Sequence, residues 1–162
     1  MREKDRETIS LYSRESTGTF YWGAMNEHSF TEAVVNKLPK DVHVQSMTMA
    51  SLTHTGTPDR YIDLNRDLWV EFKYAKTFGT KGYNVGEMVS ERQKKWLKRR
   101  WDAGANAIVI VGVPSSDSKV ARARGFVLTH PSEWEGIILP EVFIPRLRWA
   151  AELAGYILER VT

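Results

Sequence analysis

Residues 59 to 74 contain the feature of this sequence that most constrains its fold. Segments 61–64 and 68–74 are short and rich in apolar and aromatic residues, and they flank the polar turn Asn65-Arg66-Asp67. This pattern predicts a β-hairpin. If the hairpin is centred on Asn65, Asp59 lies opposite Glu71. A turn with an even number of residues would place these two side chains on opposite faces, so the turn must be odd in length.

Three charged side chains then share one face of the predicted hairpin. Asp59 follows Pro58, and Glu71 and Lys73 are two residues apart on the second strand, so both point to the same side. Directly opposed side chains are about 5 Å apart at Cβ, close enough for one ion to contact both carboxylates. Carboxylates bind Mg²⁺, and an ammonium group beside them can act on water or on phosphate charge. The pattern predicts a Mg²⁺-dependent phosphodiesterase site.

The same charges also fit the outer face of a half-exposed strand, and this alternative stays open. An acid-x-Lys tripeptide is expected about once by chance in a chain of this composition. A second copy, Asp117-Ser118-Lys119, lies in a polar stretch without a flanking strand, and we discard it. A Pro-Asp pair upstream of Glu-x-Lys on a predicted hairpin is rarer, which favours the site.

The composition excludes several classes of protein. The chain of 162 residues is long enough for one domain with a core, and it has no cysteine for disulfides, thiolate zinc sites or nucleophiles. Its four histidines lack zinc-ligand spacing, and neither a phosphate-binding Gly-rich loop nor a Gly-x-Ser-x-Gly elbow is present. Its longest apolar run is too short for a bilayer, and the charged N-terminus is unlike a signal peptide. We expect a cytoplasmic protein, in a bacterium or in the host cell of a phage.

The remaining periodicity predicts an α/β domain. We expect helices over residues 26–38, 90–103 and 147–161, strands over 42–49, 108–111 and 125–128, and a short helical turn over 131–136. With the hairpin, the order α-β-β-β-α-β predicts a single domain, residues 26–162, with a mixed β-sheet flanked by helices. Residues 1–25 are polar without a period and predict an N-terminal arm. Gly79, Gly82 and Gly86 predict a mobile loop after the hairpin.

Other polar residues are candidates for the same site. Two metals would need a third acid, and the predicted helix 26–38 offers Glu27 and Glu32. The helix dipole alone explains an acid in the first turn, so we prefer Glu32 to Glu27, with a surface glutamate as the alternative. Gln93 lies among apolar residues of helix 90–103 and needs a partner. It reaches the phosphate or a metal-bound water, or it forms a capping box with Ser90; both alternatives stay open.

The net charge is only +3, which is weak evidence for a polyanionic partner. The cations are nevertheless clustered on helix 90–103. Five of them are candidates for phosphate contacts with DNA: Arg92, Lys94, Lys95, Lys98 and Arg99. A solvated helix face is the alternative for each of them. Trp96 and Trp101 are expected in the core, and base stacking is the less favoured alternative.

These motifs resemble the PD-(D/E)XK nuclease superfamily, and more narrowly the stand-alone VRR-NUC domains and phage-type Holliday-junction resolvases. The resemblance covers roughly residues 27 to 113. It is carried by Gly56-Thr57-Pro58-Asp59-Arg60, Leu68-Trp69-Val70-Glu71-Phe72-Lys73, Ser90-Glu91-Arg92-Gln93-Lys94-Lys95-Trp96-Leu97 and Ala103-Gly104-Ala105-Asn106-Ala107. The spacer 74–89 is longer and richer in glycine than the family pattern.

The resemblance implies a restriction-endonuclease-like fold and DNA cleavage that depends on Mg²⁺, with Mn²⁺ as a substitute. It assigns the following residues to the site: Asp59 and Glu71 as metal ligands with the Phe72 carbonyl, Lys73 beside the water, Gln93 as the family's glutamine and Glu32 as its helical glutamate. We therefore expect an endonuclease for branched or structured DNA in recombination, repair or phage replication. One site per domain implies a homodimer for paired cuts. A sequence-specific restriction-type endonuclease and a non-catalytic nucleic-acid-binding accessory protein are the alternatives.

Overall fold

The computed structural model describes residues 25–47, 56–115 and 123–162. Within these ranges six strands form one sheet, in the order β1 (His43–Ser46), β2 (Arg60–Asp63), β3 (Asp67–Tyr74), β5 (Ala107–Val113), β6 (Arg124–Leu128) and β8 (Arg148–Trp149). β3 and β5 are parallel, and the other neighbouring pairs are antiparallel. The mixed α/β architecture predicted from the sequence is confirmed. Residues 1–24 of the predicted arm and Asp117 lie outside the described ranges.

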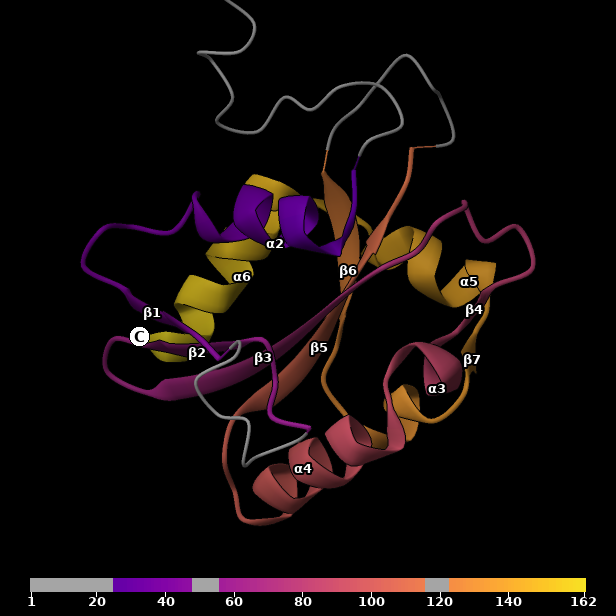
Figure 1. Ribbon diagram of the computed structural model, residues 1–162. Helices are drawn as coiled ribbons and strands as arrows, with labels where there is room; N and C mark the ends of the chain where they lie inside the picture. The colour runs from indigo at the N-terminus through magenta and orange to yellow at the C-terminus, as the bar shows by residue number, and fades with distance from the viewer. Residues whose placement is uncertain (1–24, 48–55, 116–122) are drawn as a thin grey trace, which may run out of the picture.

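Helices cover both faces of this sheet. α2 (Glu27–Val35) and α6 (Ala150–Val161) lie on one face, and α4 (Glu91–Asp102) lies on the other (Figure 1). Strand side chains alternate between the faces, so β3 sends Val70 and Phe72 to one core and Trp69 to the other. All seven residues of β5 are buried, as expected for a strand that is covered on both sides.

The hairpin has the predicted register. Arg60 lies opposite Val70 and Asp63 opposite Asp67, so the turn is centred on Asn65 and contains the three residues 64–66, one position before the predicted 65–67. The backbone N–H groups of Asn65 and Arg66 both donate to the Val161 carbonyl, at 2.9 and 3.0 Å. A carbonyl at the end of α6 that lacks a helical partner therefore fixes the turn.

Capping residues set the helix ends close to the predicted positions. Asn26 and Ser90 form capping boxes at the starts of α2 and α4. Gly104, with a φ of 81°, follows the end of α4. α2 ends at Val35, three residues earlier than predicted, and α6 begins only at Ala150 because the two residues before it pair with β6.

The spacer 74–89 is packed, which corrects the prediction of a mobile loop. It contains β4 (Tyr83–Asn84), which pairs with β7 (Ile137–Ile138), and α3 (Val85–Met88). The Gly79 N–H donates to the hydroxyl of the buried Tyr83 at 2.8 Å. A Cβ atom at Gly79 would lie 2.7 Å from the Gly82 carbonyl oxygen, so glycine here permits close packing of the backbone.

Short elements complete the described chain. They are the 3₁₀ helices η1 (Pro131–Trp134), which confirms the helical turn predicted there, and η2 (Ile144–Arg146), with α5 (Pro140–Phe143) between them. In the part of the chain that the structure describes, no helix is long and apolar enough to cross a membrane.

Candidate active site

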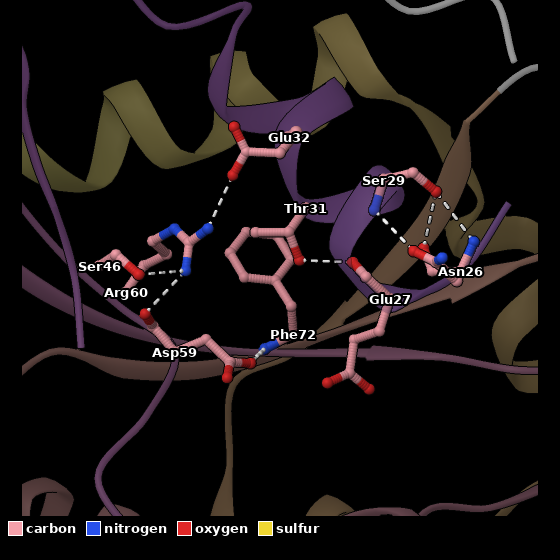
Figure 2. Close-up of polar contacts among 9 residues, drawn as sticks. All are labelled: Asn26, Glu27, Ser29, Thr31, Glu32, Ser46, Asp59, Arg60 and Phe72. Carbon is pink, nitrogen blue, oxygen red and sulfur yellow. Dashed lines mark hydrogen bonds and ion pairs between the residues drawn. The ribbon is translucent and has the colours of Figure 1, made fainter. Parts of the chain in front are cut away.

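The motif residues lie where β2 and β3 separate. β2 begins at Arg60, opposite Val70, so β3 continues beyond the last pair of the hairpin. The same register carried one position further puts Asp59 opposite Glu71. Asp59 Oδ2 accepts a hydrogen bond from the Phe72 N–H at 2.9 Å (Figure 2). In a continued ladder a strand carbonyl would accept this bond, so the carboxylate of Asp59 takes the place of the missing strand.

The backbone of Asp59 is held from two directions. Its carbonyl oxygen accepts hydrogen bonds from the Met47 N–H and from Arg60 Nη1, both at 3.0 Å. Arg60 is itself buried and donates to Ser46 Oγ at 3.1 Å (Figure 2). The position of the carboxylate is therefore set by β1 and by the first residue of β2.

Glu71 is fully buried. Its Oε1 atom lies 2.6 Å from Lys73 Nζ and accepts a short hydrogen bond from Gln93 Nε2. Its Oε2 atom is buried and has no hydrogen-bond partner among the described residues. Buried carboxylate oxygens are nearly always satisfied, and leaving one without a partner is costly. The second oxygen of Glu71 is thus available to a ligand from outside the chain.

The carboxyl groups repel one another and are poorly hydrated. Burial raises the pKa of Glu71 to about 8; the negative charge of Asp59 adds to this effect, and Lys73 opposes it. Burial also raises the pKa of Asp59, against the hydrogen bond from Phe72 and the charge of Lys73. A bound cation would lower the pKa of both Asp59 and Glu71 and stabilise their charged forms. The site therefore favours the binding of a cation.

Lys73 is the cation that the chain itself supplies. Burial lowers the pKa of Lys73, but the nearby carboxylates of Glu71, Glu27 and Asp59 outweigh this effect, and the net shift is upward. The ammonium group therefore stays charged at neutral pH, beside Glu71 and 3.8 Å from Glu27 Oε1.

The third acid near the site is Glu27, not the preferred Glu32. Glu32 Oε1 forms an ion pair with Arg60 Nη2 at 2.7 Å, whereas the Nη1 atom of the same guanidinium group bonds the Asp59 carbonyl (Figure 2). Glu27 extends from the first turn of α2 towards β3, where the charges of Lys73 and Asp59 act on it. Burial, followed by the charge of Asp59, raises the pKa of Glu27 against the opposing charge of Lys73. The helix dipole explains why an acid lies in the first turn of α2, and Glu27 can at the same time act in the site.

Gln93 forms the capping box and also contacts Glu71, whereas its contact with a phosphate or a metal-bound water stays a prediction. Its Oε1 atom accepts the Ser90 N–H at 3.0 Å as part of the capping box, and its Nε2 atom donates to Glu71. An amide has a separate acceptor and donor, so one side chain fixes the start of α4 and holds the buried carboxylate.

The cations predicted to contact DNA are not equivalent. Lys94 is enclosed: its ammonium group donates to the Gly86 carbonyl at 2.9 Å and pairs with Glu91. These contacts occupy the ammonium group, so they do not favour Lys94 as a phosphate contact. Lys98 pairs with Asp102 at 2.7 Å on the surface. The three remaining cations, which are exposed and share one face of α4 by their spacing, are Arg92, Lys95 and Arg99.

One tryptophan also departs from the prediction. Trp101, expected in the core, has 38% of its surface exposed and lies edge-on to His130. Trp96 is partly buried and contacts Trp69. Trp101 is the residue before the last one of α4.

The donor set fits a hard divalent cation. Within the described residues, no three His, Asp or Glu side chains are grouped so that they could hold a metal ion by themselves. Mg²⁺ does not need such a group, because it usually binds one or two carboxylates together with water and substrate phosphate. Asp59 and Glu71 provide two carboxylates. The Phe72 carbonyl points to the same strand edge as its N–H, towards Asp59.

Comparisons with known proteins give a similarity in fold but none in sequence. No protein-family model and no curated protein matches this sequence. A solved structure of Hjc, a Holliday junction resolvase from the archaeal hyperthermophile Archaeoglobus fulgidus, is similar in fold. The identity is 16%, the TM-score is 0.49, and the match covers 80% of this chain and 96% of the other. This likeness concerns the fold alone.

Proposed function

We propose that this protein is a metal-dependent endonuclease that hydrolyses phosphodiester bonds in branched or structured DNA. One observation carries the proposal: Asp59, Glu71 and Lys73 converge where β2 and β3 separate, and Glu71 Oε2 is buried with no hydrogen-bond partner among residues 25–47, 56–115 and 123–162. A structural ion pair would leave no carboxylate oxygen unsatisfied. A protein that only binds DNA gains nothing from directing two carboxylates at phosphates.

Each site residue has the role that fits the chemistry of its side chain. Asp59, Glu71 and the Phe72 carbonyl would hold Mg²⁺, or Mn²⁺ in its place. When bound, the cation would neutralise phosphate charge and lower the pKa of a water molecule. Lys73, charged and beside Glu71, would orient the attacking water and stabilise charge on the phosphate. Gln93 would keep Glu71 in place.

Glu27 would complete the acidic set in the position first given to Glu32. Its carboxylate lies beside Lys73 and is affected by the charge of Asp59, so it can position water or a second cation. Glu32 would act on structure, through Arg60 and hence through the backbone of Asp59. The exposed cations of α4 would contact DNA phosphates.

The preference for branched DNA rests on the resemblance of the motif segments to those of Holliday-junction resolvases. Resolution of a four-way junction needs two nearly symmetric cuts, and the described part of the chain offers one such site. We therefore include a C2 homodimer, with both sites on a common basic surface, in the proposal.

A panel of substrates tests the proposal. The purified protein is incubated with duplex, single-stranded, flap and four-way DNA of matched sequence, in Mg²⁺ and in EDTA. We expect cleavage only in Mg²⁺, fastest on branched DNA, and sedimentation as a dimer. Binding without cleavage would indicate the accessory protein, and cleavage at one duplex sequence the restriction-type enzyme. A monomer that prefers linear duplex would remove the junction preference and leave the general nuclease.

A further inference from the structure

An aromatic cluster lies directly beside the catalytic carboxylates on the same face of the sheet. Tyr61 and Trp69 are paired across β2 and β3, two residues from Asp59 and Glu71 respectively. The Tyr61 and Trp69 rings are 4.7 Å apart, and the Trp69 and Trp96 rings are also 4.7 Å apart. All three rings are only partly buried. The fold therefore keeps three large aromatic groups within reach of solvent at the edge of the site.

One face of α4 contacts both the active site and this cluster. Gln93 contacts Glu71, and Trp96, one turn further along, contacts Trp69. α4 thus runs opposite to β3, and its next turn brings Arg100 over the same rings. The guanidinium carbon of Arg100 lies 4.9 Å from the centre of the Trp96 ring and 5.6 Å from that of Trp69.

Arg100 is exposed and has no ion-pair partner among the described residues. A cation stacked on partly exposed indoles, with no carboxylate to neutralise it, offers the two features by which proteins bind a nucleotide without regard to its sequence. These are a π surface for the base and a positive charge for the phosphate. A solely structural aromatic cluster would need neither the exposure nor the free charge.

We propose that Tyr61, Trp69, Trp96 and Arg100 form a stacking site for an unpaired base of the DNA substrate. This inference rests on the proposed function and specifies its substrate as DNA with an unstacked nucleotide close to the cut. Side chains two residues apart on a strand are about 7 Å apart, which is at most about two nucleotide steps. The stacked base belongs to a nucleotide within about two positions of the scissile phosphate. An intact duplex keeps its bases stacked inside and cannot use the site, whereas a flap, gap or junction can.

Binding measured in EDTA tests this inference independently of cleavage. The two probes are a plain duplex and the same duplex with a short single-stranded gap, both followed by fluorescence anisotropy. We expect the gapped probe to bind more tightly and to quench tryptophan fluorescence. Tyr61→Thr and Arg100→Gln should each weaken binding of the gapped probe, by about 5- to 150-fold for the loss of one stack. They should change duplex binding much less.

Trp101→Leu is the matched control, because Trp101 is an exposed tryptophan of the same helix outside the cluster. It should leave the preference for the gapped probe unchanged. Equal losses on both probes, or an unchanged preference in the two cluster variants, would overturn the stacking site. If the wild-type protein keeps the preference in EDTA but never cuts in Mg²⁺, the stacking site stands and the proposed nuclease activity fails.

Discussion

The buried carboxyl group of Glu71 should make the stability of the metal-free protein fall as pH rises. Burial raises the pKa of Glu71 to about 8 in the folded protein, whereas the pKa of glutamate in an unfolded chain is about 4.3. Between these two values the folded protein holds a proton that the unfolded chain has lost. The free energy of unfolding therefore decreases from about pH 4.5 to about pH 8 and levels off above that range.

The size of the effect follows from the two pKa values. One group contributes a slope of at most about 1.4 kcal/mol per pH unit, and a shift from about 4.3 to about 8 gives a total of about 5 kcal/mol. The raised pKa values of Asp59 and Glu27 act in the same direction. Lys73 contributes nothing in this window, because its pKa is raised from 10.5 and it is charged in both states.

Urea unfolding in EDTA, repeated between about pH 5 and about pH 8, measures this dependence. Glu71→Gln keeps the shape of the side chain and removes the titration, so the variant should lose much less stability over the range. The stability of the variant relative to the wild-type protein should rise by several kcal/mol from the acidic to the basic end, about 1 kcal/mol per pH unit. Mg²⁺ at the basic end should stabilise the wild-type protein but not the variant. Parallel pH profiles for the two proteins would refute the reasoning.

Three further outcomes follow from the geometry. Gln93→Leu should lower both stability and the cleavage rate, whereas Ser90→Ala should cost about 1 kcal/mol of stability through the same helix cap and leave the rate close to that of the wild-type protein; urea unfolding and single-turnover kinetics separate the two. Lys73→Ala should reduce the maximal rate by about 10²–10⁴-fold with little change in the Mg²⁺ concentration needed, and a large loss of Mg²⁺ affinity at full rate would contradict its role. Lys95→Gln should reduce the log–log salt dependence of DNA binding by about 0.9. Lys94→Gln, whose ammonium group is bound to a backbone carbonyl, should leave it unchanged, and equal slopes for both variants would remove α4 from the DNA surface.

The hairpin could be predicted from residues that are close in sequence. Alternation and an odd turn centred on Asn65 fix which residues face one another, and the observed register agrees. The capping box at Ser90 and the glycine at 104 bounded α4 for the same reason, because each acts within one helical turn. The convergence of Asp59 with the backbone of β3 could therefore be predicted from residues that are close in sequence.

Contacts between distant elements could not be predicted in this way. The choice between Glu27 and Glu32 depends on where α2 crosses the sheet, and the position of the buried Arg60, which pairs with Glu32, decides it. The glycines of segment 74–89 predicted a mobile loop from their conformational freedom. The segment is instead packed, because β7, more than fifty residues later, pairs with it. The aromatic cluster was missed because Trp69 and Trp96 belong to different elements.

The most direct test of the active site is single-turnover cleavage of one labelled four-way junction by the wild-type protein, Glu71→Gln and Glu32→Gln at equal concentrations. We expect cleavage by the wild-type protein in Mg²⁺ and none in EDTA. Glu71→Gln should bind the junction without cleaving it, whereas Glu32→Gln should retain cleavage at a temperature where it remains folded. Full activity of Glu71→Gln in Mg²⁺, after contaminating nuclease is excluded, would contradict the central claim.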